Sequence, residues 1–251
     1  MKPALSLTLL VLAFLAGTVL SAGTAAAVPP DPKDPRLNGN QRLQALVDRI
    51  KLEQQQLKTL EARFEQRQES SLLAAPETST GVFSYAAPDR VRWEYTSPNP
   101  ISVVIRGEQM TTWYRDLERA ELLKIGRYSN QVFKYLGASG SMKSLLEYFD
   151  VTMGTSRTKG EPFRLELVPR YQRIAKRLKT MTIWIDDRAY LPVRLRYIEA
   201  DGDVIEYKLT DLRKNGRIPD DRFVLQIPKG VDTKVIDLGR EAGSGSRGGG
   251  R

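Results

Sequence analysis

Residues 81–107 read GVFSYAAPDRVRWEYTSPNPISVVIRG, and apolar and polar side chains alternate along them. Val91, Trp93 and Tyr95 occupy one phase of the alternation, and charged residues occupy the phase between them. A two-residue period is typical of a strand that has one face buried and the other in water. Proline and glycine interrupt the pattern between its runs, where tight turns are expected. The stretch therefore predicts successive antiparallel strands that share one apolar face.

The same alternation continues on both sides of this stretch. It recurs in the segments 60–65, 163–167, 181–185, 191–197 and 204–209. Asp201-Gly202 is a strong hairpin signal before the last of these segments, and Phe223, Leu225 and Ile227 form a further alternating run. Because no strand precedes a helix long enough for a parallel crossover, we expect an antiparallel sheet of about ten or eleven strands.

Two regions have helical periodicity instead. Leu46, Ile50 and Leu57 lie on one face of a predicted helix that runs directly into the first strand, within 41–69. Residues 127–149 contain two short helical candidates around a glycine-rich break, and because glycine lets the backbone move, we expect them to form a helical lid. The apolar face of its second helix would consist of Met142, Leu145, Leu146 and Phe149.

The two ends of the chain differ from its middle. Residues 1–27 combine a basic start, a long apolar run and small residues at the end, which is typical of a cleavable secretory signal peptide. Residues 28–38 contain four prolines and are expected to form an extended, unstructured leader. The glycine-rich residues 239–251 are expected to form a disordered tail. A single domain over 39–238 remains, and we expect it to be soluble after export.

The composition excludes most catalytic chemistry. The chain has no histidine and no cysteine, so it cannot form a Ser–His or Cys–His nucleophile system, an ordinary zinc site or a disulfide. The acidic pairs Asp186-Asp187 and Asp220-Asp221 are interpreted as turn residues. We therefore expect no enzymatic activity, no metal and no cofactor.

The formal net charge of the chain is +9. A positive surface attracts anionic membranes, phosphates or acidic proteins. Because an exported protein rarely meets nucleic acid, we expect no nucleic-acid partner. Basic residues are unusually dense in 170–179, which fits either a solvated edge or an edge that faces a membrane.

The apolar face of the predicted sheet needs a cover. One N-terminal helix and a short lid cannot cover about ten strands, so we expect the sheet to curl into an incomplete barrel around an apolar cavity. An ordinary packed core is the alternative. The fold class is thus mainly β (α+β). The predicted cavity residues are Phe64, Phe83, Val91, Trp93, Tyr95, Ile105, Met110, Leu165, Ile183, Leu195 and Tyr197.

Several short motifs follow one another in a specific order. Gly81-Val82-Phe83 precedes PDRVRWEY at 88–95, and Gly107 with Trp113-Tyr114 lies at the next predicted hairpin. The closing motifs are Leu191-Pro192-Val193, Asp201-Gly202-Asp203, Pro219, Phe223 and Pro228-Lys229-Gly230-Val231. In the order and spacing of these motifs, over roughly residues 41–237, the chain resembles the LolA family of periplasmic lipoprotein carriers.

The resemblance implies a fold, a location and a set of partners. The fold would be an incomplete β-barrel whose helices form a lid over an apolar cavity. The protein would be a soluble monomer in the periplasm of a Gram-negative bacterium. It would receive acylated lipoproteins from an ABC exporter in the inner membrane and deliver them to the outer membrane, usually through a receptor. That receptor is itself a lipoprotein, and because this chain has no cysteine to acylate, it resembles the soluble carrier instead.

One position departs from the family pattern. Many carriers have a basic residue directly before the proline of the PDRVRWEY motif, where it helps to latch the lid, and this chain has Ala87 there. Arg90 and Arg92 are expected on the face opposite Trp93. Two alternatives stay open: a half-barrel protein that binds or transports free lipid or glycolipid, which the departure favours, and a periplasmic regulator that senses lipid.

Overall fold

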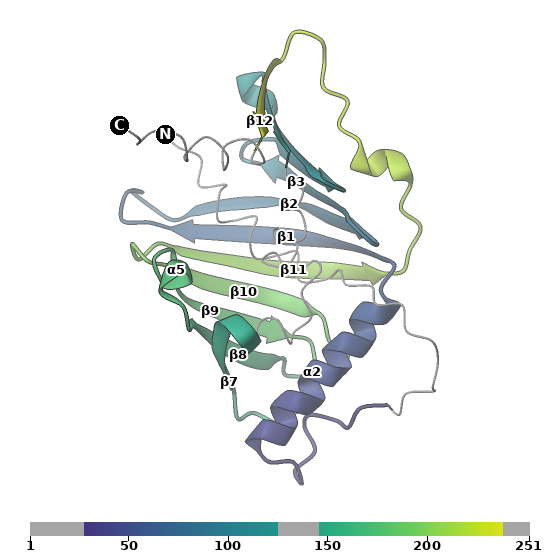
Figure 1. Ribbon diagram of the computed structural model, residues 1–251, viewed down its shortest axis with the longest axis vertical. Helices are drawn as coiled ribbons and strands as arrows, with labels where there is room; N and C mark the ends of the chain where they lie inside the picture. Colours follow the sequence, from purple (N-terminus) through teal and green to yellow (C-terminus); the bar gives the residue numbers. More distant parts are fainter. Residues whose placement is uncertain (1–27, 125–145, 238–251) are drawn as a thin grey trace, which may run out of the picture.

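The computed structural model describes residues 28–124 and 146–237 (Figure 1). Twelve strands form one sheet in the order β12-β6-β5-β4-β3-β2-β1-β11-β10-β9-β8-β7. They are β1 (Thr59–Glu69), β2 (Glu77–Ala86), β3 (Arg90–Ser97), β4 (Ile101–Arg106), β5 (Gln109–Tyr114), β6 (Arg119–Lys124), β7 (Phe149–Met153), β8 (Phe163–Pro169), β9 (Leu178–Ile185), β10 (Pro192–Glu199), β11 (Val204–Lys214) and β12 (Asp232–Asp237). The edges β12 and β7 do not pair with each other, so the expected incomplete, mainly β fold is confirmed.

The predicted helix is α2 (Gly39–Gln56), and β1 follows it almost directly. Asn38 caps the helix by accepting a hydrogen bond from the Gln41 backbone, and the Gln41 side chain accepts one from the Asn38 backbone. This reciprocal pair satisfies two backbone donors that a helix start otherwise leaves open. The sequence prediction of a helix running into a strand is confirmed.

Helix α2 packs its apolar side against the inner face of the sheet. Leu46, Val47 and Ile50 are buried in the main core together with side chains from both halves of the sheet. Near its start, Arg42 donates to the Ser156 carbonyl between β7 and β8, at 2.9 Å. Near its end, Glu53 pairs with Lys214 of β11, at 2.7 Å. The helix therefore spans the β7–β11 half of the sheet (Figure 1).

The C-terminal strand corrects two sequence predictions. β12 pairs with β6 in parallel, so the sheet is not antiparallel throughout, and it has more strands than expected. Phe223, Leu225 and Ile227 are not a strand: Phe223 ends the short helix η3 (Asp220–Phe223), and the other two follow it. The segment between β11 and β12 crosses the outer face of the sheet, where Phe223 packs against Ala86 and Val104. A crossover without a long helix thus allows the parallel pairing.

The leader is neither unstructured nor extended throughout, because backbone hydrogen bonds close two turns, at 31–34 and 34–37. Lys33 donates to Asp187 at 2.6 Å and to two backbone carbonyls of the 158–161 turn, at 2.5 and 2.7 Å. Arg157 donates to the Leu37 carbonyl at 2.8 Å. These contacts fix residues 28–38 to the turns after β7 and β9. The prediction of an unstructured leader was wrong because the proline content does not show that Lys33 and the Leu37 carbonyl have binding partners elsewhere in the chain.

The predicted lid falls mostly outside the described residues. Met142 and Leu145 lie there, as do the signal peptide and the C-terminal tail. Leu146 lies in a helical turn at 146–148 and packs partly buried against the main core. Phe149 is the first residue of β7, paired with Pro169 of β8. Its assignment to a lid helix is therefore corrected: strand pairing with β8 begins at this residue.

Candidate functional site

Aromatic rings from neighbouring strands fill the centre of the inner face. The Phe64 ring of β1 lies edge-on to the rings of Trp93 and Tyr95 of β3, with centroids 5.2 and 4.9 Å apart. Phe83 of β2 contacts the Trp93 ring at 4.4 Å. Such pairs contribute about 0.5–1.5 kcal/mol beyond the burial of their surface. The predicted cavity residues of this half thus form a tight aromatic cluster.

Gly81 makes room for this cluster. It lies opposite Phe64 in the pairing of β1 with β2. A Cβ atom at this position would lie 2.6 Å from the Phe64 ring and 2.0 Å from the backbone oxygen of Glu94. The register of β2 against β3 shifts between Thr80 and Gly81, and glycine in a strand often marks such a close backbone approach. The first residue of the GVF motif is therefore required by packing.

A polar side chain lies within the apolar face. Gln66 of β1 is buried, and its Oε1 accepts hydrogen bonds from the hydroxyls of Tyr95 at 2.9 Å and Tyr207 at 3.0 Å. Burial raises the pKa of Tyr95 to about 12, so the phenol stays neutral and can donate. Neither Gln66 nor Tyr207 was predicted as a site residue. The signal was available, because Gln66 continues the buried phase of Leu60, Ala62 and Phe64.

The remaining predicted residues lie on the same face. Val91, Ile105, Leu165, Ile183, Leu195 and Tyr197 are buried in the main core, and Met110 packs partly buried against it. They come from β3, β4, β5, β8, β9 and β10, so the structure brings every predicted cavity residue into one continuous apolar surface. In the structure these side chains pack against one another and against α2.

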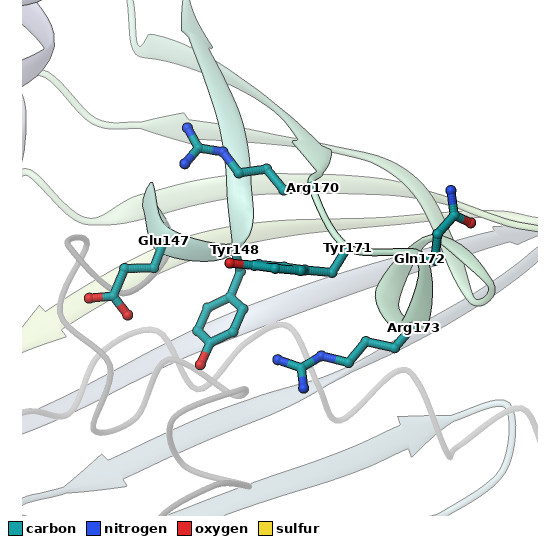
Figure 2. Close-up of a pocket in the computed structure, with 6 residues that line it drawn as sticks. All are labelled: Glu147, Tyr148, Arg170, Tyr171, Gln172 and Arg173. Atoms are coloured by element: carbon teal, nitrogen blue, oxygen red, sulfur yellow. The ribbon is translucent and has the colours of Figure 1, made fainter.

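An open pocket of about 800 Å³ lies at the β7–β8 edge of the sheet. Figure 2 shows its lining: Glu147, Tyr148, Arg170, Tyr171, Gln172 and Arg173. The short helix α5 (Gln172–Ala175) carries Arg173 towards the rings of Tyr148 and Tyr171. Sequence reasoning identified the basic residues after β8 but not the pocket.

Comparisons with known proteins agree with this architecture. The family described as outer membrane lipoprotein carrier protein LolA matches residues 55–226. The chain belongs to the LolA family. An outer-membrane lipoprotein carrier protein of Alkalilimnicola ehrlichii is 28% identical over 186 residues, which cover 72% of this chain and 78% of that protein. An outer-membrane lipoprotein carrier protein of Pseudomonas putida strain W619 is 27% identical over 194 residues, which cover 77% of this chain and 86% of that protein.

A solved structure supports the fold of this LolA family member. An uncharacterized conserved protein from Thermus thermophilus superposes with a TM-score of 0.50 at 10% sequence identity. The match covers 77% of this chain and 98% of that one. Within residues 28–124 and 146–237, no helix is both long and apolar enough to cross a bilayer.

The position expected to latch the lid in the LolA family is apolar here. Ala87 packs partly buried against the main core, and its backbone N–H donates to the Lys58 carbonyl at 2.8 Å. As expected, Arg92 lies on the outer face, where it donates to the backbone carbonyl of Arg222 at 2.9 Å. Arg90 forms an ion pair with Asp220. Both arginines hold the crossover segment before β12, so neither replaces the missing basic residue on the inner face.

Glu94 organises the same outer surface. Its carboxylate accepts hydrogen bonds from Arg92 at 2.6 Å, Arg115 at 2.6 Å and Ser102 at 3.0 Å. Burial by itself would raise the pKa of Glu94, but the hydrogen bonds from Arg115, Arg92 and Ser102 outweigh it and lower the pKa. This network links β3 and β4 beneath the crossover.

One group of carboxylates in the described part of the chain lies close enough to share a cation. Glu199, Asp201 and Asp203 are at the β10–β11 turn, with oxygens within 4.8 Å of one another. Burial, followed by the charges of Asp201 and Asp203, raises the pKa of Glu199. Asp201 also accepts a hydrogen bond from the Asp203 backbone at 3.2 Å, as turn aspartates commonly do. We assign no metal to this turn.

Proposed function

We propose that this protein is a periplasmic carrier that binds the acyl chains of lipoproteins on the inner face of its sheet. The observation that carries the proposal is one continuous apolar face on an open sheet, in a chain that belongs to the LolA family. Burial of an acyl chain of roughly fifteen carbons yields about 12 kcal/mol, which is enough to keep it out of water.

The packing of the face supports reversible binding. Its aromatic and aliphatic side chains contact one another. An acyl chain that enters must therefore exchange side-chain contacts for its own, and the net gain is smaller than for an empty cavity. A carrier needs this property, because a cargo held with the full free energy of burial would not be released.

The predicted lid residues are part of the proposal. Leu146 and Phe149 already contact the apolar face, one from the turn before β7 and one from β7 itself. Together with Met142 and Leu145, Leu146 would cover the face when no cargo is bound, beside Phe149 of β7. Cargo would then take the place of these side chains.

The proposed route runs from the inner to the outer membrane. The cargo would come from an ABC exporter and pass to an outer-membrane receptor where one exists. The names of the relatives support this route, since those proteins are outer-membrane lipoprotein carriers. The lack of cysteine supports the carrier over an acylated receptor.

Site-specific photo-cross-linking tests the proposal. A photoreactive phenylalanine analogue at Val151, which packs against the inner core, should capture acylated proteins in the periplasm, and so should one at Met110. The same analogue at Thr152, the exposed next residue on the outer face of β7, is the matched control. Capture of acylated protein at the two inner positions no greater than at Thr152 would overturn the proposal.

Free lipid is the second candidate cargo, and Ala87 is the observation that favours it, because the expected latch for lipoprotein release is absent. Mass spectrometry of ligands extracted from the purified protein separates the two. Free glycolipid, isoprenoid or phospholipid without acylated peptides would favour this candidate, and acylated peptides alone would exclude it.

A further inference from the structure

Residues 170–179, which join β8 to β9 and include the first two residues of β9, hold the densest run of cations in the described sequence. Within ten residues it contains five cations and no acid: Arg170, Arg173, Lys176, Arg177 and Lys179. The last four side chains belong to exposed residues, and within the described ranges none of them forms an ion pair. Of these five cations, Arg170 alone has an ion-pair partner within the described ranges, Asp150 at 2.8 Å. We call this segment, with Tyr148 and Tyr171, the basic rim.

Two tyrosines give the basic rim an aromatic surface. The rings of Tyr148 and Tyr171 lie 5.9 Å apart at 60°. The Arg173 guanidinium lies over both, 5.9 Å from the first ring and 5.4 Å from the second. Figure 2 shows these side chains around the open pocket, and 47% of Tyr171 is exposed. Tyrosine and arginine together are the side chains that proteins place at the headgroup level of a membrane.

Apart from the Arg170–Asp150 pair, no acid in the described ranges forms an ion pair with this surface. Glu147 lines the pocket, but it forms no ion pair with Arg173 in the described part of the chain. The acidic β10–β11 turn adjoins the rim: Glu199 pairs with Leu178, and the Ala200 N–H donates to the Arg177 carbonyl at 3.1 Å. Burial, followed by the charges of Asp201 and Asp203, raises the pKa of Glu199. The rim cations therefore remain available to an external anion.

The basic rim adjoins the inner face of the sheet. Tyr148 and Ile174 pack partly buried against the main core, and β7 begins one residue after Tyr148. A surface that the rim contacts would thus lie next to the end of the apolar face. We propose that the basic rim docks this protein on the anionic phospholipid headgroups of a bilayer. The proposal concerns the membrane and does not depend on which cargo the inner face carries.

Vesicle binding tests the docking proposal with the full mature chain. We expect sedimentation with phosphatidylcholine vesicles that contain phosphatidylglycerol, much weaker binding to phosphatidylcholine alone, and a decrease as salt is raised. Each cation near an anionic surface contributes about fivefold to binding. The triple variant Arg173→Gln, Lys176→Gln, Arg177→Gln should therefore bind about 100-fold more weakly.

A second triple variant controls for net charge. Arg213, Arg217 and Lys229 are exposed, and among the described residues they form no ion pair. Arg213 lies near the end of β11 that is remote from the β10–β11 turn. Replacing all three with Gln removes the same charge and should leave vesicle binding within about threefold of the native protein. Equal losses in the two triple variants would overturn the proposal, as would absence of binding to anionic vesicles.

Discussion

Replacing Gly81 with alanine should destabilise the protein strongly, because the added methyl has no space. Its carbon would lie 2.0 Å from the Glu94 carbonyl oxygen and 2.6 Å from the Phe64 ring. The ring can rotate a little, but the carbonyl belongs to the backbone of β3, which is paired on both sides. Overpacking typically lowers the free energy of unfolding by about 1–3 kcal/mol. Because this clash involves backbone, we expect Gly81→Ala to lower it by about 3 kcal/mol.

Equilibrium unfolding in guanidinium chloride, followed by tryptophan fluorescence, measures this loss. In a domain of about 200 residues, a loss of 3 kcal/mol corresponds to a decrease in Tm of about 6–12 °C. The matched control is Gly39→Ala at the first residue of α2, where no heavy atom lies within 4 Å. That variant should gain about 0.5–1 kcal/mol, because alanine favours the helix. A loss below about 1 kcal/mol for Gly81→Ala would refute the packing argument.

Three further predictions concern polar contacts. Tyr95→Phe and Tyr207→Phe should each lower the free energy of unfolding by about 1 kcal/mol. The double variant should lose more than the sum of the two, because it removes both hydrogen bonds to the buried Gln66 oxygen, and an additive double-mutant cycle would contradict this. The pKa of Glu94 is lower in the folded state than its ordinary value of 4.5. The ionised carboxylate therefore stabilises the folded protein fully above pH 4.5, and this stabilisation is lost as the pH falls through the folded pKa. Glu94→Gln should therefore destabilise the protein at neutral pH and flatten its acid-induced loss of stability, and an unchanged pH profile of unfolding would count against the network. Lys33→Met should release the leader and speed tryptic cleavage after Arg36 at least about tenfold, since hydrogen bonds from charged groups contribute about 1.5–3 kcal/mol each.

Most strands were predictable because burial follows the alternation of the sequence. Along β3, Val91, Trp93 and Tyr95 are buried and the residues between them are only half-buried. The turns were equally clear: Gly107 and Gly202 have φ of +55° and +100°, which glycine adopts without strain. Local pattern therefore decides these strands and the hairpins that join them.

The crossover before β12 was not predictable in this way. Phe223 and Leu225 alternate like strand residues, but they pack on the outer face, where Arg90 and Arg92 hold the segment. Those partners lie about 130 residues earlier in the chain, and a short window of sequence does not contain them. β12 itself gives a weak signal, since it is mostly exposed and Val235 is 57% accessible.

The inner face was predicted as a set of apolar residues, and its polar centre was missed. Gln66 lies in the buried phase of β1, but a search for apolar residues at alternate positions does not select a glutamine. Its two tyrosine partners come from β3 and β11, so only the assembled sheet shows why an amide is tolerated there. The cavity and lid assignments of the individual side chains remain predictions.

The order of the strands has a consequence for folding. In the described sheet, every pairing joins strands that follow one another in the chain, except β1 with β11 and β6 with β12. β2 can pair with one edge of β1 as soon as both strands are available. The other edge pairs with β11, whose Tyr207 lies 141 positions after Gln66 in the chain. An unpaired strand with an apolar face is a site where other chains add. We therefore expect the folding chain to be most prone to aggregation before β11 pairs with β1, at the centre of the finished sheet.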